Sequence, residues 1–145
     1  MFSKTLYSSA SDEWETPQAL FDELDREFHF TLDAAATKDN AKCENYFTPE
    51  TDGLKQNWEG QTVWLNPPYG RSVKAWMKKA YEEGHKPGTT VVALVFSRTD
   101  TAWFHEYVYQ KAEIRFIRGR LKFGQATNVA PAPSMVIIWR GPEKE

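Results

Sequence analysis

Residues 63–70 read Val-Trp-Leu-Asn-Pro-Pro-Tyr-Gly, and this stretch carries the clearest chemical signal in the chain. Proline holds φ at about −65°, has no N–H and keeps the residue before it extended. Asn66 is therefore expected at the rigid end of a strand, with its side-chain oxygen and nearby carbonyls projecting and the flat ring of Tyr69 beyond them. This pattern suits a planar ligand that carries an amino group, because the oxygens can accept its hydrogens. It is also typical of an ordinary turn after a strand.

Hydrophobic spacing predicts the elements that position this corner. Strands are expected at residues 30–34, 62–65, 91–96, 114–117 and 135–139. One helix is expected to end near residue 28, with Thr16 as its capping hydroxyl and Pro17 as its first helical residue. Further helices are expected at 73–84 and after a cap at Thr99 or Asp100, whereas residues 37–61 lack periodicity and are expected to be irregular.

The alternation of strands and helices favours an α/β fold, with a mostly parallel sheet and helices on both faces. Ligands of such sheets bind at the carboxyl ends of the strands. Asp33, Asn66 and the Ser97-Arg98 pair all fall at the carboxyl ends of predicted strands. We therefore expect them to share one cleft.

Length and composition limit the protein classes. The 145 residues suffice for one domain, expected at 14–142 after a loose tail at 1–13. An apolar run long enough to span a bilayer and a secretory amino terminus are both missing, so no membrane partner is expected. The single cysteine, Cys43, cannot form an internal disulfide and favours a cytoplasmic location. Its spacing from the three histidines predicts no metal site.

Charge is nearly balanced over the whole chain but locally basic. The net charge of −2 gives no general sign of a nucleic-acid partner. However, arginines and a lysine gather at 115–122, and basic residues follow the Asn-Pro-Pro-Tyr run. Phosphate contacts need only such a local surface. The candidate DNA contacts are Arg71, Arg98, Arg120 and Lys122; the alternative is a solvated helix face and an exposed hairpin.

Several stretches together resemble the phage-type DNA adenine methyltransferases, the Dam-like family of bacteriophages and prophages. The stretches are Glu13-Trp14-Glu15-Thr16-Pro17, Leu32-Asp33-Ala34-Ala35-Ala36, Thr51-Asp52-Gly53-Leu54 with Trp58, Trp64-Leu65-Asn66-Pro67-Pro68-Tyr69, Ser97-Arg98-Thr99-Asp100-Thr101 with Trp103-Phe104-His105, and Gly119-Arg120-Leu121-Lys122-Phe123. They follow one another in order, so the resemblance covers nearly the whole chain.

The resemblance implies a Rossmann-like class I methyltransferase fold that transfers a methyl group from S-adenosylmethionine to the 6-amino group of adenine in DNA, in the cytoplasm of a bacterial host. The catalytic residues it implies are Asn66, Pro67, Pro68 and Tyr69. The side-chain oxygen of Asn66 and the carbonyl of Pro67 would accept the two amine hydrogens, so that the nitrogen lone pair becomes available for attack. Tyr69 would stack on an adenine rotated out of the duplex.

The cofactor contacts that the resemblance implies are Thr16, Pro17, Asp33, Ala34, Ala35 and Asp52. Asp33 would bind the ammonium group of S-adenosylmethionine, Thr16-Pro17 its methionine part and Asp52 its adenine amine. Plain structural roles stay open, because Thr16 could be only a helix cap and Asp52 could only start a turn. The turn after Asp33 lacks the glycines common in methyltransferases, and residues 37–61 are too few and too polar for two strand–helix units. The sheet is therefore expected to be reduced in its first half.

Two other classes of function remain open from the sequence. A methyltransferase of this kind could act on another amine, such as cytosine N4, RNA adenine or a protein glutamine. Alternatively, the missing glycines and the short first half would suit a degenerate module that binds DNA without chemistry. A purely structural protein is a third class, and the six tryptophans do not distinguish it because they suit the core in every case.

Overall fold

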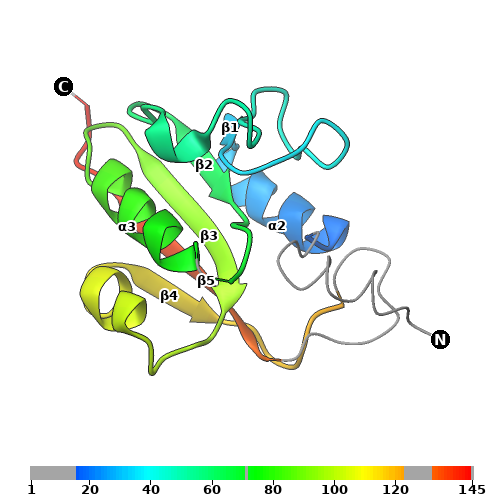
Figure 1. Ribbon diagram of the computed structural model, residues 1–145, viewed down its shortest axis with the longest axis vertical. Helices are drawn as coiled ribbons and strands as arrows, with labels where there is room; N and C mark the ends of the chain where they lie inside the picture. Colours follow the sequence, from blue (N-terminus) through cyan, green and yellow to red (C-terminus); the bar gives the residue numbers. More distant parts are fainter. Residues whose placement is uncertain (1–15, 71, 123–131, 145) are drawn as a thin grey trace.

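The computed structural model describes residues 16–70, 72–122 and 132–144, built around one five-stranded sheet (Figure 1). The strands are β1 (Leu32–Asp33), β2 (Thr62–Leu65), β3 (Thr90–Phe96), β4 (Glu113–Phe116) and β5 (Ser134–Arg140). Helices α2 (Gln18–Phe28) and α3 (Val73–Gly84) pack on the sheet, and η1 (Gly53–Lys55) and η2 (Phe104–Val108) are single turns. The predicted α/β class is confirmed, whereas the proposed tail at 1–13 lies outside the described residues.

The sheet has the order β1-β2-β3-β5-β4 and is mostly parallel, as predicted. The first three strands are parallel, with Leu32 opposite Val63 and Val63 opposite Val91. β5 runs antiparallel to both β3 and β4, so in the described sheet it is the strand that opposes the others. Its residues are buried up to Trp139, which gives an apolar run compatible with either direction.

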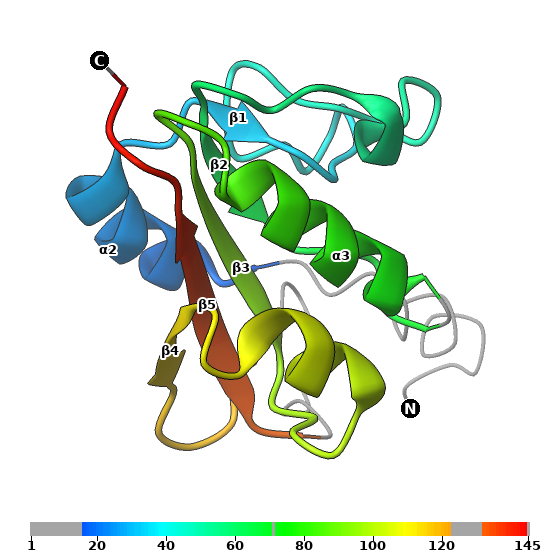
Figure 2. The ribbon, with the colours of Figure 1, turned by 90° about the vertical axis from the view of Figure 1, so that its left-hand side faces the viewer.

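Helices cover both faces of the sheet (Figure 2). On one face α3 buries Val73, Trp76, Met77 and Ala80 against alternate residues of β2, β3 and β5. Gly84 is the last residue of α3, and its backbone is not left-handed. Glycine is needed there because a Cβ would lie 2.5 Å from Trp139 Cβ.

On the opposite face α2 places Phe21 and Leu24 against the other side of the same strands, including Trp64 and Val92. The rings of Phe21 and Trp64 meet edge to face with centroids 5.4 Å apart. Because successive strand residues point to opposite faces, β2 and β3 contribute to both apolar layers. The sheet edge that holds their carboxyl ends is thereby fixed from two sides.

Two predicted helix caps are wrong. Pro17 stands at the N-cap of α2 and Thr16 makes no capping bond, because the Thr16 hydroxyl is engaged elsewhere. Before η2 the hydroxyl of Thr101, rather than Thr99 or Asp100, accepts from the Phe104 N–H at 3.3 Å. Local sequence marks capping residue types, but a tertiary contact decides which hydroxyl is used.

The first half of the sheet is reduced, as predicted. β1 has two residues instead of the five expected, although Thr31 and Ala34 also donate backbone hydrogen bonds to β2. Between β1 and β2 the chain is irregular apart from η1 and an isolated parallel bridge from Asp33 to Tyr46. No helix in the described part of the chain has the length and apolar character needed to cross a bilayer.

Candidate active site at the carboxyl ends of β1 and β2

A cavity of about 290 Å³ opens where β1 and β2 end. Its walls come from the turn after β1, from residues 40–42 and 48–53, from the corner after β2 and from Trp76 of α3. Of the predicted site residues it brings together Thr16, Asp33, Ala34, Ala35, Asp52, Asn66 and Pro68. The predicted meeting of strand ends is therefore confirmed for β1 and β2.

Asp33 is a buried carboxylate on this cavity, only 3% exposed. Its oxygens accept backbone N–H bonds from Lys42 at 2.9 Å and from Ala35 at 3.3 Å. Burial raises the pKa of Asp33 to about 6, although these N–H groups and the charge of Lys42 oppose the rise. Among the described residues no cationic side chain forms an ion pair with this carboxylate.

The turn after Asp33 is closely packed although it contains no glycine. Ala34 is fully buried, and the backbone of Gly53 lies against its carbonyl. A Cβ at residue 53 would lie 2.2 Å from the Ala34 oxygen, so only glycine fits there without movement. The glycine that packs closely against this turn therefore comes from the opposite wall.

Asp52 lies beside Gly53 on the same wall, with the left-handed φ of 54°. Its side chain accepts from the Leu54 N–H at 3.2 Å and caps η1, and its other oxygen lies 3.9 Å from Lys55 Nζ. The turn-forming role considered for Asp52 is therefore present, and the residue faces the cavity as well.

Asn66 and Thr16 meet at the cavity across a separation of 50 residues. The Asn66 side-chain nitrogen donates to the Thr16 hydroxyl oxygen at 2.9 Å, and Thr16 itself is only 4% exposed. Pro17 and Pro67 do not line the cavity, and Pro67 is buried behind the corner. The side-chain oxygen is the acceptor atom of the Asn66 amide, because its nitrogen is used as a donor.

Tyr69 does not line the cavity. Its hydroxyl accepts from the Phe96 N–H at 2.7 Å and lies 3.2 Å from the Phe96 carbonyl, to which it can donate. Its ring packs against that of Phe96, with centroids 4.6 Å apart. Burial raises the pKa of the Tyr69 hydroxyl far above its ordinary value, so this group remains a protonated donor.

Comparison with known families assigns the chain. The family DNA N-6-adenine-methyltransferase (Dam) matches residues 3–145. This chain belongs to the Dam family. The DNA N-6-adenine-methyltransferase of Haemophilus phage HP1 (strain HP1c1) is 31% identical over 139 residues, which cover 90% of this chain and 80% of that protein. That of Escherichia phage T1 is 37% identical over 112 residues, 76% of this chain and 46% of the phage protein.

The resemblance found in the sequence is confirmed by these matches. Among solved structures, that of a candidate RNA methyltransferase from Pyrococcus horikoshii has a TM-score of 0.47 and 12% identity, covering 68% of this chain and 52% of that one. This likeness is too weak to bear on the activity of the Dam-family chain.

The described residues of this Dam-family chain that were predicted to contact DNA do not line the cavity. Arg98 follows β3, is exposed and stands 5.8 Å from the centroid of the Phe96 ring. Arg120 and Lys122 are exposed after β4. Since β4 runs in the direction of β3, these residues leave the sheet at the same edge as Asn66. Arg71 lies outside the described residues.

Arg115 belongs to a different set of contacts. Its guanidinium pairs with both oxygens of Glu27 at 2.7 and 2.8 Å, and its Nε donates to Glu113 at 2.6 Å. It therefore joins α2 to β4, and the basic group at 115–122 is partly structural. An arginine whose guanidinium is already held in a bidentate pair with a carboxylate is a poor contact for a phosphate.

Sequence reasoning missed several cavity residues of the Dam-family site, including Lys42 and Thr48. Both stand in the irregular segment, where no periodicity predicts which side chains face inward. Trp76 belongs to the buried face of α3 and also lines the cavity.

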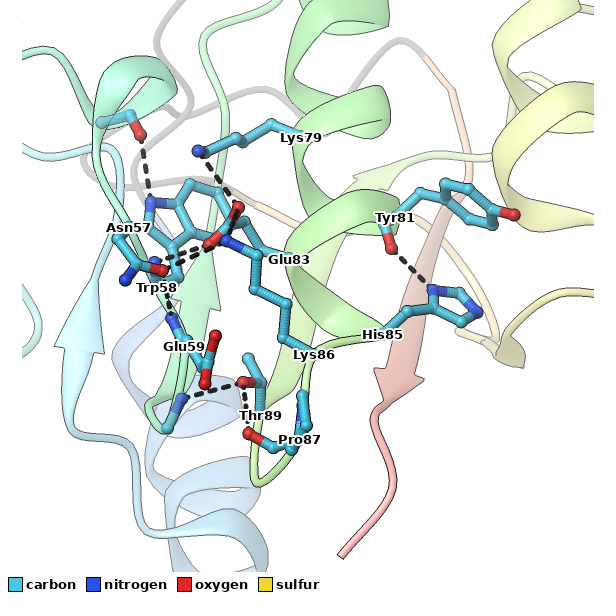
Figure 3. Close-up of polar contacts among 12 residues, drawn as sticks. Asn57, Trp58, Glu59, Lys79, Tyr81, Glu83, His85, Lys86, Pro87 and Thr89 are labelled. Carbon is cyan, nitrogen blue, oxygen red and sulfur yellow. Dashed lines mark hydrogen bonds and ion pairs between the residues drawn. The ribbon is translucent and has the colours of Figure 1, made fainter. Parts of the chain in front are cut away.

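Hydrogen bonds of Trp58 and Glu83 (Figure 3) support the cavity wall from behind Gly53. The Trp58 indole donates to the Gly53 carbonyl at 3.0 Å, and the Trp58 N–H donates to Glu83 of α3 at 2.6 Å. Glu83 also accepts from Lys86 at 2.7 Å and Lys79 at 3.3 Å. Burial alone would raise the pKa of Glu83, but the hydrogen bonds from Lys86 and Trp58 hold it below its ordinary value. The wall is thereby tied to the end of α3.

Proposed function

We propose that this chain methylates the 6-amino group of adenine in DNA, using S-adenosylmethionine held in the cavity between Asp33 and Asn66. Membership of the Dam family supports the reaction and its substrate. One observation carries the assignment of the site: a buried carboxylate and the asparagine of the Asn-Pro-Pro-Tyr corner line a single cavity at adjacent strand ends.

The wall around Asp33 suits a cationic ligand. S-adenosylmethionine supplies a methyl group on a positively charged sulfonium and also carries an ammonium group. Asp33 is buried with backbone N–H partners and no described ion pair, so a bound cation would compensate the cost of burying its charge. Ala34 and Ala35 leave room beside it. We assign Asp33 to the ammonium group.

The remaining cofactor contacts follow from the same cavity. Asp52 stands on the wall opposite the turn after β1, where its carboxylate can accept from the adenine amine of the cofactor. Thr16 lies on the Asn66 side and is assigned to the methionine part. Pro17 acts indirectly, because it holds the start of α2 next to Thr16.

Asn66 is assigned the acceptor role toward the target adenine. Its side-chain oxygen and the Pro67 carbonyl would receive the two amine hydrogens, which draws the nitrogen toward a tetrahedral shape and frees its lone pair for attack. A neutral amide suits this task, since it accepts hydrogen bonds without taking up a proton at neutral pH. The corner of Pro67 and Pro68 holds the acceptors rigid, and such preorganisation is the main source of rate.

Tyr69 is assigned to the adenine ring. Its hydroxyl is fixed to the end of β3, so the phenol ring is held rigidly. Rotating a base out of a duplex costs roughly a few kcal/mol. Stacking on an aromatic ring offsets about 1–3 kcal/mol of that cost. The DNA backbone is assigned to Arg71, Arg98, Arg120 and Lys122.

Methylation of genomic DNA with labelled S-adenosylmethionine, followed by mass analysis of the digested nucleosides, tests this function. We expect N6-methyladenine from the wild-type protein and a rate reduced about 10²–10³-fold in Asn66→Ala, the range found when an oriented hydrogen-bonding group is removed. Asn45→Ala, a change at an exposed asparagine outside the cavity, should retain the wild-type rate. Undiminished transfer by Asn66→Ala would refute the assigned mechanism, and methylcytosine as product would move the activity to another amine.

A further inference from the structure

Of the residues that line the cavity, Lys42 is the basic one. It is half-buried and lines the cavity, and its ammonium donates to the side-chain oxygen of Gln18 at 2.7 Å. Of the ion pairs among described residues, none includes Lys42. A half-buried ammonium bonded to a neutral amide retains the capacity to bind an anion, because Lys has three donor hydrogens.

Both ends of Lys42, its ammonium and its backbone N–H, make hydrogen bonds to other elements. The Gln18 side-chain nitrogen donates to Asp22 at 2.8 Å, which turns its oxygen toward Lys42. At the other end of the residue, the Lys42 backbone N–H donates to Asp33 at 2.9 Å. The loop that carries Lys42 is therefore tied to both α2 and β1.

Lys42 and Asp33 bring one basic and one acidic residue together on the same side of the cavity, whereas Asp52 belongs to the opposite wall. The charge of Lys42 acts on Asp33, where it opposes the rise in pKa that burial causes. A ligand that complements this pair carries an ammonium and a carboxylate close together. That is the arrangement of an α-amino acid, and in S-adenosylmethionine it belongs to the methionine part.

We infer that the Lys42 ammonium binds the carboxylate of S-adenosylmethionine while Asp33 binds its ammonium, so that the two residues recognise the amino-acid end of the cofactor as a zwitterion. This inference rests on the proposed function. It assigns to Lys42 a role in choosing the ligand, beyond its structural bond to Gln18. A carboxylate adds the attraction of an opposite charge to the hydrogen bond, so it is a better partner for the ammonium than the neutral amide of Gln18.

Decarboxylated S-adenosylmethionine, which keeps the sulfonium, adenine and ammonium but lacks the carboxylate, is the deciding probe. Calorimetric titration of both compounds should be carried out on the wild-type protein, Lys42→Met and Lys38→Met. Lys38 is exposed on the same loop and does not line the cavity, so it provides the matched control. A melting curve for each variant confirms that it is folded.

The inference requires a ligand-dependent effect. We expect Lys42→Met to weaken S-adenosylmethionine about 10–100-fold, as the loss of a hydrogen bond between charged groups predicts, and to weaken the decarboxylated compound less than about twofold. Lys38→Met should change neither. Equal losses for both compounds, or no loss, would overturn the inference and leave Lys42 as a structural tie.

The wild-type titration distinguishes failure of the Lys42 role from failure of the proposed function, and it does not depend on the folding of a variant. Tighter binding of S-adenosylmethionine than of its decarboxylated form supports the role of the carboxylate, and equal or weaker binding overturns it. Absence of S-adenosylmethionine binding at millimolar concentration would instead remove the proposed function itself.

Discussion

The Thr16 hydroxyl accepts a hydrogen bond of 2.9 Å from the Asn66 amide nitrogen, and so joins the start of α2 to the corner after β2. This contact identifies the amide nitrogen as the donor toward Thr16. It also explains why Thr16 does not cap its own helix, since its oxygen is already used across the fold.

Replacing Thr16 by valine preserves the shape of the side chain but removes the oxygen. We expect a fall of about tenfold in the single-turnover methylation rate, since one hydrogen bond contributes roughly 1–1.5 kcal/mol. Thr16→Ser retains the oxygen and should recover most of the rate, which separates positioning of Asn66 from packing. A valine variant as fast as the wild-type protein would show that the amide does not need this partner.

Gly53→Ala should damage the cavity through backbone contact. The new Cβ would meet the Ala34 carbonyl at 2.2 Å, so one wall must move. We expect a loss of about 1–3 kcal/mol in the free energy of unfolding, as overpacking usually costs, together with weaker S-adenosylmethionine binding. Urea denaturation and calorimetry measure the two effects.

Gly60→Ala provides the control for that experiment. Gly60 has a φ of 81° and open space around its missing side chain, so alanine there suffers backbone strain without a clash. We expect reduced stability but unchanged ligand binding. If Gly53→Ala also bound S-adenosylmethionine normally, the wall at residue 53 would have no part in the site.

Asp33 predicts a specific pH dependence. Its pKa is about 6 in the folded protein, above the unfolded value of roughly 3.9. The folded state thus favours the protonated form, and the stability that Asp33 contributes is fully present below pH 4 and is lost as pH rises through 6. Between pH 4 and pH 7 the wild-type protein should therefore lose up to about 3 kcal/mol of unfolding free energy relative to Asp33→Asn.

Ligand binding should show the opposite trend. Because the ionised carboxylate binds the cation, wild-type affinity for S-adenosylmethionine should rise as pH increases through 6, and Asp33→Asn should bind weakly throughout. Calorimetry at several pH values checks this. An unfolding difference that stays flat from pH 4 to 7 would show that Asp33 titrates normally.

Glu83 should matter for stability and, through Trp58, for the cavity. Glu83→Leu leaves the buried Trp58 N–H and the ammonium of Lys79 without their partner, and we expect a loss of about 3 kcal/mol. Glu83→Gln keeps an acceptor for Trp58 and should lose less. Chemical denaturation of both variants tests this order, and equal losses would mean that the Trp58 hydrogen bond contributes little.

Local patterns predicted the parts of the fold that depend on local chain properties. β2 and α3 begin and end within one residue of expectation, because alternation and helical spacing are written into neighbouring residues. The direction of β5 was beyond such patterns, since a buried apolar strand looks the same whether parallel or antiparallel. The strand-end rule placed Asp33 and Asn66 together correctly.

The candidate site was harder to predict where its contacts are long-range. Thr16 was read as a cap because threonine before proline is typical of one, but its partner lies 50 residues away. The contact between the rings of Tyr69 and Phe96 joins residues 27 positions apart and depends on the sheet, so local sequence could not predict it. Lys42 sits in a segment without periodicity, so its inward position could be seen only in three dimensions.

The brevity of β1 has a kinetic implication. A two-residue strand leaves much of one cavity wall as irregular chain, held by a few backbone hydrogen bonds and the tie from Trp58. Such a region opens by local fluctuation at lower free energy than the β3–β5 ladder. Ligand binding in the cavity should therefore slow amide hydrogen exchange in the turn after Asp33, while the exchange rates of the central strands stay the same.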